Sequence, residues 1–380
     1  MVIVSPKVPA GRYNVLFMSD PGTESTLAPL RKRIDELDHK LVDTLNERAS
    51  VVVEIGRIKR GDDSPTYAPE RERVVLSQVR SVNRGPLPDK TLEAIWRELM
   101  SGSFALERPL RVGFLGPPGS FSHLAARRKF GASVEYDNLE DIAAVFEEIG
   151  RGHTDLGLVP IENSLIGGIG ETLDGFLESS VHVCAEVLIN IHHNLLANCP
   201  PEKIKNVYSK PEVFRQCRKW LSVQLRHAQR TPVASSSRAA EMAAVETDGS
   251  AVGSTLAGEI YGLKTQFANI EDNPNNTTRF FVIGRQESKP TGDDKTAIMF
   301  TTEHKSGALS SVLNVFREHG LNLTHIDKRP SKSVNWEYYF FVDVLGHQQG
   351  EAVQKAIAAA RSHCLQLRVL GSFPRATEML

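Results

Sequence analysis

The longest helical pattern in the chain runs from residue 27 to residue 59. Apolar side chains recur there every three or four residues, which is the period of one helix face. They are Leu30, Ile34, Leu37, Leu41, Leu45, Val52, Ile55 and Ile58. A helix of this length extends about 50 Å, more than the diameter of a small domain. Because it needs a partner along its whole length, we predict a helix-swapped or antiparallel dimer.

Loop-forming residues divide the following segment into two more helices. Residues 61–69 form a polar stretch, so we expect a second helix at 70–82 and a third at 89–106. Residues 26–108 are therefore predicted to be an all-α domain of three helices.

Beyond residue 109 short strands alternate with amphipathic helices. We expect strands at 111–115, 156–161, 181–191, 206–209, 251–254 and 280–284, with helices such as 139–150 and 211–221 between them. This alternation predicts an α/β domain over residues 110–286 with a mostly parallel sheet. Its length suits two lobes with a cleft between them.

After a polar linker at 287–294, the elements follow the order β-α-β-β-α-β. The expected strands are 297–301, 323–327, 337–345 and 366–370, and the expected helices are 308–319 and 351–362. This order is that of the ferredoxin-like α+β fold. We therefore predict a third compact domain over residues 295–376.

Composition narrows the class of protein. With 380 residues and 41% hydrophobic residues the chain can fill several cores, and its net charge of −1 argues against a nucleic-acid binder. No apolar run reaches the roughly 18 residues of a membrane span. The four cysteines lack metal-binding spacing, so we expect free thiols, no metal site and a cytoplasmic location.

The first residues make a poor signal peptide, because prolines and a glycine break their apolar pieces. Residues 1–25 are predicted to be a flexible extension, in which Met18 is an alternative start.

Three cations on the long helix cannot converge within one straight helix. Arg48 and Lys59 are eleven residues apart and so lie within about 20° of each other, whereas Arg31 points roughly 100° away. Helices from two protomers can bring all three to one point. On the third helix, Ser103 and Glu107 share a face. Taken singly, each Arg is more often a solvated surface charge.

Together these residues resemble the all-helical chorismate mutase domain across 26–108. The matching stretches are Leu30-Arg31-Lys32-Arg33-Ile34-Asp35, Glu47-Arg48, Lys59, Pro69-Glu70-Arg71-Glu72, and Ser103 with Glu107. The resemblance implies an intertwined dimer that rearranges chorismate to prephenate. This pericyclic step needs a folded substrate conformer and stabilisation of negative charge on the ether oxygen.

The resemblance also implies roles for individual residues. The partner subunit's Arg31, together with Arg48 and Arg71, would form the cationic site, with Arg31 and Arg48 on the two carboxylates. Lys59 would lie at the ether oxygen facing Glu107, and Ser103 would line the site. Glu72 would hold the ring hydroxyl.

Two positions depart from the pattern of the mutase family. Glu107 stands where some relatives have Gln, and a Glu donates to the ether oxygen only when it is protonated. We therefore expect mutase activity to fall with rising pH. Ala68 stands where relatives often have Asp, which removes one polar contact.

Four polar stretches of the α/β domain follow strands, where open sheets place their ligands. They are Gly116-Pro117-Pro118-Gly119-Ser120-Phe121-Ser122-His123, Pro160-Ile161-Glu162-Asn163-Ser164, Tyr208-Ser209-Lys210-Pro211 and Asn276-Thr277-Thr278-Arg279-Phe280. The first is not a phosphate-binding Walker loop, and no hydrolase triad is recognisable. Singly they are tight turns and helix caps.

In this order the four stretches closely resemble prephenate dehydratase over 110–286, which implies a periplasmic-binding-protein-like fold and conversion of prephenate to phenylpyruvate without a cofactor. Thr278 is implied as the hydrogen-bond donor to the departing hydroxyl. Asn163, Ser209 and Gln216 would complete the polar site. Arg279 would hold a carboxylate or be structural. Lys210 replaces a His that is frequent in the family.

Residues 295–376 resemble an ACT domain, a regulatory amino-acid-binding module. Gly307, Ala308 and Leu309 begin its first helix, and Arg329 and Pro330 match a second motif, whereas the two residues before Arg329 differ. The resemblance implies feedback regulation by phenylalanine at these residues. It also implies side-by-side pairing of ACT domains, in a homodimer or larger assembly.

The combined resemblance indicates a bifunctional chorismate mutase/prephenate dehydratase of phenylalanine biosynthesis, without cofactor, membrane or nucleic-acid partner. Two alternatives stay open. One is a dehydratase for prephenate or arogenate whose mutase domain is weakened. The other is a non-enzymatic ligand sensor.

Overall fold

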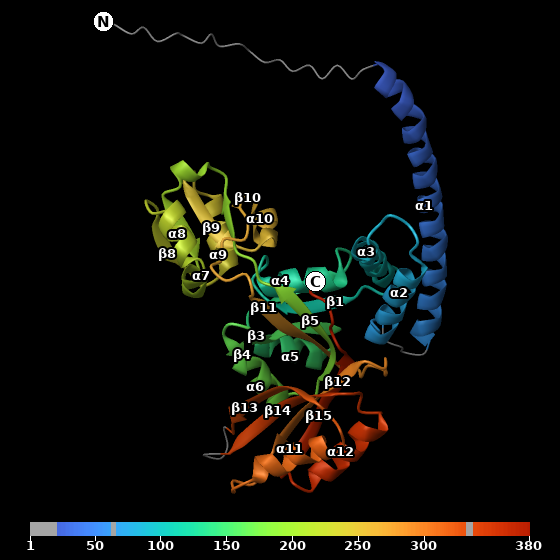
Figure 1. The fold of residues 1–380 in the computed structure, drawn as a ribbon, viewed down its shortest axis with the longest axis vertical. Coiled ribbons are helices and arrows are strands. Elements are labelled where there is room, and N and C mark those ends of the chain that lie inside the picture. Colours follow the sequence, from blue (N-terminus) through green and yellow to red (C-terminus); the bar gives the residue numbers. More distant parts are fainter. Residues whose placement is uncertain (1–20, 62–65, 332–336) are drawn as a thin grey trace, which may run out of the picture. The chain divides into compact units, whose positions relative to one another are not determined.

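The computed structural model describes residues 21–61, 66–331 and 337–380 (Figure 1). The chain forms two compact units, divided between Ile55 and Gly56. Helix α1 (Pro21–Gly61) has 41 residues and begins before the expected residue 27. The first 20 residues of the predicted extension, Met18 included, lie outside the described residues.

Helices α2 (Pro69–Val82) and α3 (Asp89–Glu107) confirm the predicted helices in the second unit. Proline at the start of α2 and two acidic residues in its first turn suit a helix N-terminus. Gly56 lets the last turns of α1 approach α3, because a Cβ at Gly56 would lie 2.9 Å from the Cα of Glu107.

The first sheet has the strand order β2-β1-β3-β11-β5, with β4 paired to β3. Its strands are β1 (Arg111–Leu115), β2 (Glu135–Leu139), β3 (Leu156–Asn163), β4 (Gly167–Gly168), β5 (His182–Asn190) and β11 (Thr277–Gly284), with helices α4 (Phe121–Phe130), α5 (Ile142–Arg151) and α6 (Gly170–Glu178). Two hydrophobic clusters of buried side chains hold this lobe together, one of them including side chains of α4 and the other those of α5 and α6.

The second sheet has the order β10-β6-β9-β7-β8. Its strands are β6 (Asn194–Ala197), β7 (Asn206–Ser209), β8 (Gln229–Pro232), β9 (Gly249–Gly253) and β10 (Lys264–Phe267), with the 3-10 turn η1 (Pro201–Lys203) and helices α7 (Pro211–Gln216), α8 (Arg218–Gln224), α9 (Ser236–Ala244) and α10 (Thr255–Tyr261). The helix expected at 211–221 is two helices, because Cys217 between α7 and α8 leaves the helical conformation.

The expectation of a mostly parallel sheet was wrong, since both sheets are mixed. Strand β11 runs antiparallel to β3 and β5, and β6 runs antiparallel to β9 and β10. The cause is the chain path: it crosses to the second lobe after β5 and returns only before β11. Two lobes built in this way agree with the expected two-lobed α/β fold.

The C-terminal sheet has the order β13-β14-β12-β15 and is fully antiparallel. Its elements are β12 (Asp294–Thr301), α11 (Ala308–Glu318), β13 (Leu323–Pro330), β14 (Tyr338–Leu345), α12 (Glu351–Arg361) and β15 (Gln366–Pro374). The ferredoxin-like prediction is confirmed.

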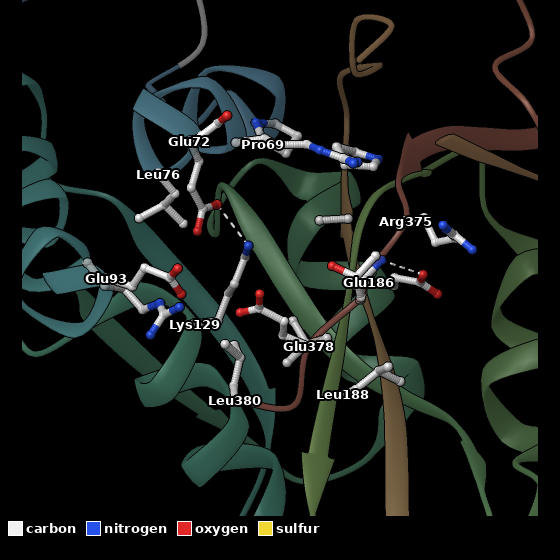
Figure 2. Close-up of a pocket in the computed structure, with 18 of the residues that line it drawn as sticks. Pro69, Glu72, Leu76, Glu93, Lys129, Glu186, Leu188, Arg375, Glu378 and Leu380 are labelled. Carbon is white, nitrogen blue, oxygen red and sulfur yellow. Dashed lines mark hydrogen bonds and ion pairs between the residues drawn. The ribbon is translucent and has the colours of Figure 1, made fainter. Parts of the chain in front are cut away.

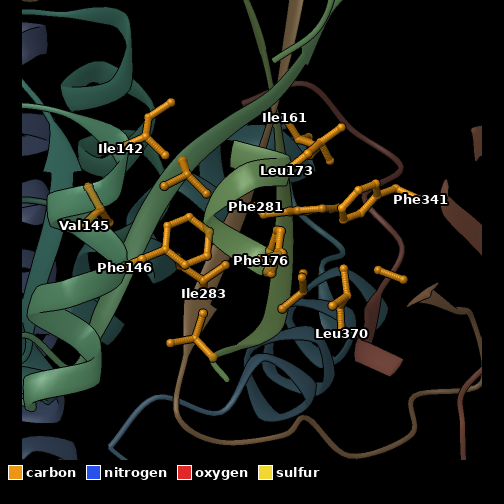
Figure 3. Close-up of a cluster of buried hydrophobic side chains, with 14 of the residues drawn as sticks. Ile142, Val145, Phe146, Ile161, Leu173, Phe176, Phe281, Ile283, Phe341 and Leu370 are labelled. Carbon is orange, nitrogen blue, oxygen red and sulfur yellow. The ribbon is translucent and has the colours of Figure 1, made fainter. Parts of the chain in front are cut away.

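Successive residues of β12 and β14 point to opposite faces of this sheet. Ile298 and Val342 pack with α11 and α12, whereas Met299 and Phe341 join the core of the first lobe. Figure 3 shows Phe341 and Leu370 facing Phe176 and Phe281. The C-terminal domain and the first lobe therefore share one hydrophobic core.

Within residues 21–61, 66–331 and 337–380, no helix is long and apolar enough to cross a membrane.

Candidate active sites

Lys59 and Glu107 meet where the end of α1 approaches α3. Lys59 Nζ lies 2.9 Å from Glu107 Oε2, and the Glu107 side chain is only 12% exposed. One turn earlier on α3, the buried Ser103 hydroxyl donates to the Leu99 carbonyl. The expected pairing of Lys59 with Glu107 thus exists in the chain. In this pair Glu107 is an acceptor, whereas donating to an ether oxygen requires one more proton.

Among the described residues, Glu72 accepts two side-chain hydrogen bonds, both through one carboxylate oxygen. Its Oε2 accepts from Lys129 Nζ at 2.8 Å and from the Tyr67 hydroxyl at 3.2 Å. Burial, and after it the charge of Glu72, raises the pKa of Tyr67, so this phenol stays a neutral donor. The Tyr67 ring packs edge-on against Phe104 and Phe130.

A cavity of about 300 Å³ has Glu72 and Lys129 in its wall, together with side chains of α3, β5 and the segment after β15 (Figure 2). Neither Lys59 nor Thr278 lines this cavity. The cavity therefore excludes the two residues predicted to act on the reacting oxygens, whereas Glu72, a predicted residue of the mutase site, lies in its wall.

The contacts described above do not show whether the other cations predicted for the mutase site come together. Arg31 and Arg48 lie on α1 in the first unit, and Arg71 is exposed on α2 in the second. Their convergence with Lys59 stays a prediction.

Asn163 and Thr278 come together at the ends of β3 and β11. Asn163 Nδ2 donates to Thr278 Oγ1 at 2.9 Å and to Asn276 Oδ1 at 2.8 Å, while Asn163 Oδ1 accepts from the backbone of Leu165 and Ile166. These four bonds fix which end of the amide faces Thr278. Since Thr278 Oγ1 is an acceptor here, its hydroxyl hydrogen is left to donate to a further group.

Ser209 and Gln216 lie in the second lobe, on β7 and α7. The buried Ser209 hydroxyl donates to the Val252 carbonyl at 2.7 Å. Gln216 Oε1 lies 2.7 Å from Nε2 of His193, a residue that the sequence analysis missed. Burial lowers the pKa of His193, and its Nδ1 has no hydrogen-bond partner among the described residues. His193 lies just after β5, where the chain passes from one lobe to the other. Because polar residues that follow a strand often line a ligand site, His193 could have been identified from the sequence.

The Gly-rich turn before α4 contacts both lobes. Gly119 has φ +86°, a Cβ there would lie 3.0 Å from Ala257, and Ser254 donates to its carbonyl at 2.7 Å. His123 Nδ1 accepts from the Gly119 N–H, and burial, followed by Arg127, lowers the pKa of His123 to about 4. Neutral His123 thus holds the turn in place.

Arg279, next to Thr278, points away from it into a buried ion cluster. Its Nε lies 2.7 Å from Glu186, and a terminal nitrogen lies 2.5 Å from Asp343 of the C-terminal domain. Lys295 also contacts Glu186, at 3.0 Å. These contacts favour the structural alternative for Arg279, and a bond from Arg279 to a substrate carboxylate stays a prediction. Lys210 is exposed at the N-terminus of α7.

The predicted regulatory residues follow strand ends at the same edge of the C-terminal sheet, because Thr301, which precedes the Gly307 turn, and Arg329 both pair with Tyr339 of β14. Gly307, with φ +79°, precedes α11, which begins with the buried Ala308 and the partly buried Leu309. Arg329 donates through two nitrogens to both carboxylate oxygens of Asp174 on α6, and Pro330 follows it at the end of β13. A phenylalanine contact at these residues stays a prediction.

Three family models match the chain in succession. They are chorismate mutase type II at residues 30–108, prephenate dehydratase at 112–288 and the ACT domain at 296–362. Their order agrees with that of the three resemblances found in the sequence.

Similar proteins cover nearly the whole chain. A bifunctional chorismate mutase/prephenate dehydratase of Stutzerimonas stutzeri is 40% identical over 92% of this chain and 98% of its own length. One of Aquifex aeolicus is 41% identical over 92% and 98%. The structure of prephenate dehydratase from Arthrobacter aurescens in complex with L-Phe is 30% identical, covers 70% of this chain and 90% of its own, and has a TM-score of 0.65. The chain belongs to the family of bifunctional chorismate mutase/prephenate dehydratases.

Proposed function

We propose that the chain catalyses two consecutive reactions of phenylalanine biosynthesis. The helical domain rearranges chorismate to prephenate, and the two-lobed domain converts prephenate to phenylpyruvate. The observation that carries this proposal is the oriented pair of Asn163 and Thr278 in a chain that aligns with 98% of its bifunctional relative.

For the rearrangement we assign Lys59 and Glu107 to the ether oxygen of chorismate. The charge that develops there is stabilised by the Lys59 ammonium and by a hydrogen bond from protonated Glu107. Arg31 of the partner subunit, Arg48 and Arg71 bind the carboxylates, and Ser103 and Glu72 hold the rest of the substrate. No nucleophile is needed.

For the dehydration we assign Thr278 to the departing ring hydroxyl. Prephenate takes up one proton and releases carbon dioxide and water, and aromatisation of the ring drives the loss. The Asn163 amide donates to Thr278 Oγ1 and so directs the Thr278 hydrogen toward the leaving oxygen. Ser209 and Gln216 are proposed to complete the site, Arg279 is proposed to support the fold next to it, and no cofactor takes part.

We further propose that phenylalanine binds the ACT domain at Gly307, Ala308, Leu309, Arg329 and Pro330 and inhibits the enzyme. The relative from Arthrobacter aurescens was solved with L-Phe, which supports this ligand. Isothermal titration of the full chain with phenylalanine is the test, and an absence of binding heat and of inhibition refutes it.

The domain limits, the assembly and the location are also proposals. We divide the chain into an N-terminal extension at residues 1–25, a mutase domain at 26–108, a dehydratase domain at 110–286 and an ACT domain at 295–376. Apolar residues of α1 support a dimer through the mutase helices, because Leu30, Ile34 and Leu41 are each more than half exposed in the single chain. Pairing of ACT domains would add a second interface to this assembly. We place the protein in the cytoplasm.

One coupled assay separates the proposal from its alternatives. Chorismate, prephenate and arogenate are supplied separately, and product absorbance is followed. The proposed function predicts turnover of chorismate and of prephenate. Turnover of prephenate or arogenate alone indicates a weakened mutase domain, and no turnover of any of the three indicates a ligand sensor.

A further inference from the structure

Lys129 belongs to the dehydratase domain, yet its ammonium group binds a residue assigned to the mutase site. It lies near the C-terminal end of α4, the helix that begins after the Gly-rich turn. Its Nζ donates to Glu72 of α2 at 2.8 Å, and the two side chains are only 14% and 11% exposed. Figure 2 shows the two side chains reaching toward each other across the domain junction.

The two oxygens of Glu72 have different surroundings. Lys129 and Tyr67 both donate to Oε2, and no described residue donates to Oε1. Lys129 also lies 5.9 Å from the centre of the Tyr67 ring, so the two donors support each other. One oxygen is thus held in place, and the other is left to accept a hydrogen bond.

We propose that Lys129 is a positioning residue for the mutase reaction. It acts through Glu72, holding Oε2 so that Oε1 accepts the ring hydroxyl of chorismate. This rests on the proposed mutase function and on the role assigned there to Glu72. The mutase site is then completed by a side chain of the dehydratase domain.

Charge is the second reason for a cation at this place. Chorismate carries two carboxylates, and an unpaired Glu72 close to them would repel the substrate. Lys129 compensates that charge in a poorly hydrated position, where ionic interactions are strong. Loss of Lys129 should therefore weaken binding of chorismate, and it should leave prephenate dehydration unaffected.

The test is a double-mutant cycle on the full-length protein. We expect Lys129→Met to raise KM for chorismate and lower mutase kcat/KM about tenfold, and Lys129→Arg to restore most of it. Dehydratase activity, assayed with prephenate itself, should stay within about twofold and reports that the variant is folded. Lys90→Met on the exposed surface of α3 is the matched control and should change neither activity.

The cycle also separates positioning from simple stabilisation. If Lys129 acts through Glu72, adding Lys129→Met to Glu72→Gln lowers mutase kcat/KM no further. Independent, multiplicative losses overturn the proposal, as does a Lys129→Met variant with unchanged mutase kinetics. A wild-type chain that fails to convert chorismate refutes the proposed mutase function itself, which is a different outcome.

Discussion

Removal of Arg279 tests whether its guanidinium belongs to the fold or to the substrate site. The cluster around it holds two positive groups, Arg279 and Lys295, and two negative groups, Glu186 and Asp343. Burial opposes the charge of Arg279, but the carboxylates of Asp343 and Glu186 outweigh it and raise the pKa of Arg279. Arg279→Met leaves two carboxylates facing a single cation.

The magnitude follows from the burial of the cluster. The side chains of Glu186 and Asp343 are 0% and 3% exposed, so the charge left over after Arg279→Met is out of reach of water. Breaking a buried ion pair by removing one partner costs about 3–5 kcal/mol. We expect a loss of this size. Arg279→Met with Asp343→Asn restores neutrality and should recover about 2 kcal/mol or more.

The free energy of unfolding is measured by urea titration, followed by circular dichroism and by residual dehydratase activity. With an m-value of about 3 kcal/mol/M, the expected loss moves the midpoint by about 1 M or more. Arg238→Met is the control, because Arg238 and its partner Glu241 are 55% and 49% exposed. That change should cost less than about 1 kcal/mol.

Two results would refute the structural role of Arg279. One is an Arg279→Met midpoint no lower than that of Arg238→Met. The other is a double variant no more stable than Arg279→Met alone. If stability is kept while KM for prephenate rises, Arg279 binds a substrate carboxylate instead.

Four further changes test other parts of the molecule. Thr278→Ala should lower dehydratase turnover at least about a hundredfold while mutase activity persists, and unchanged phenylpyruvate formation would exclude Thr278 as donor. Mutase kcat/KM measured from pH 5 to 9 should fall with rising pH, and Glu107→Gln should flatten the profile; a flat wild-type profile contradicts this. Because the pKa of His123 is about 4 when folded and about 6.5 when unfolded, stability should drop by up to about 3 kcal/mol as pH falls between these values. Acid titration of His123→Gln should show a smaller drop. Arg80→Met leaves the buried Glu93 without its ion-pair partner and should cost about 2 kcal/mol in urea unfolding, and no change would show that Glu93 is satisfied otherwise.

Elements with a strong local pattern were predicted well. The three N-terminal helices and the β-α-β-β-α-β order of the last domain lie close to their expected limits. The spacing of apolar residues that predicts these elements lies within each element, so the sequence alone shows it. Short strands such as β6, β8 and β10 were missed, because four residues carry little periodicity, although β7 of the same length was predicted.

Strand direction and charge partners depend on the path of the whole chain. The sequence motifs drew attention to Asn163 and Thr278, and the fold does join them across 115 residues. The sequence did not reveal that Arg279 contacts Glu186 and Asp343, which are 93 and 64 residues away on other strands. The Lys129–Glu72 pair was not predicted for the same reason, because no local sequence pattern around either residue indicates its partner.

Adjacent positions on β11 link the proposed dehydratase site with the C-terminal domain. Since successive side chains of a strand point to opposite faces, Thr278 turns toward Asn163 while Arg279 turns toward Asp343 on β14. The two side chains are separated by a single peptide unit. Asp343 on β14 therefore pairs with the residue next to Thr278 in the sequence. The C-terminal domain thus contacts, through a buried ion pair, the strand that carries the residue proposed to act on prephenate.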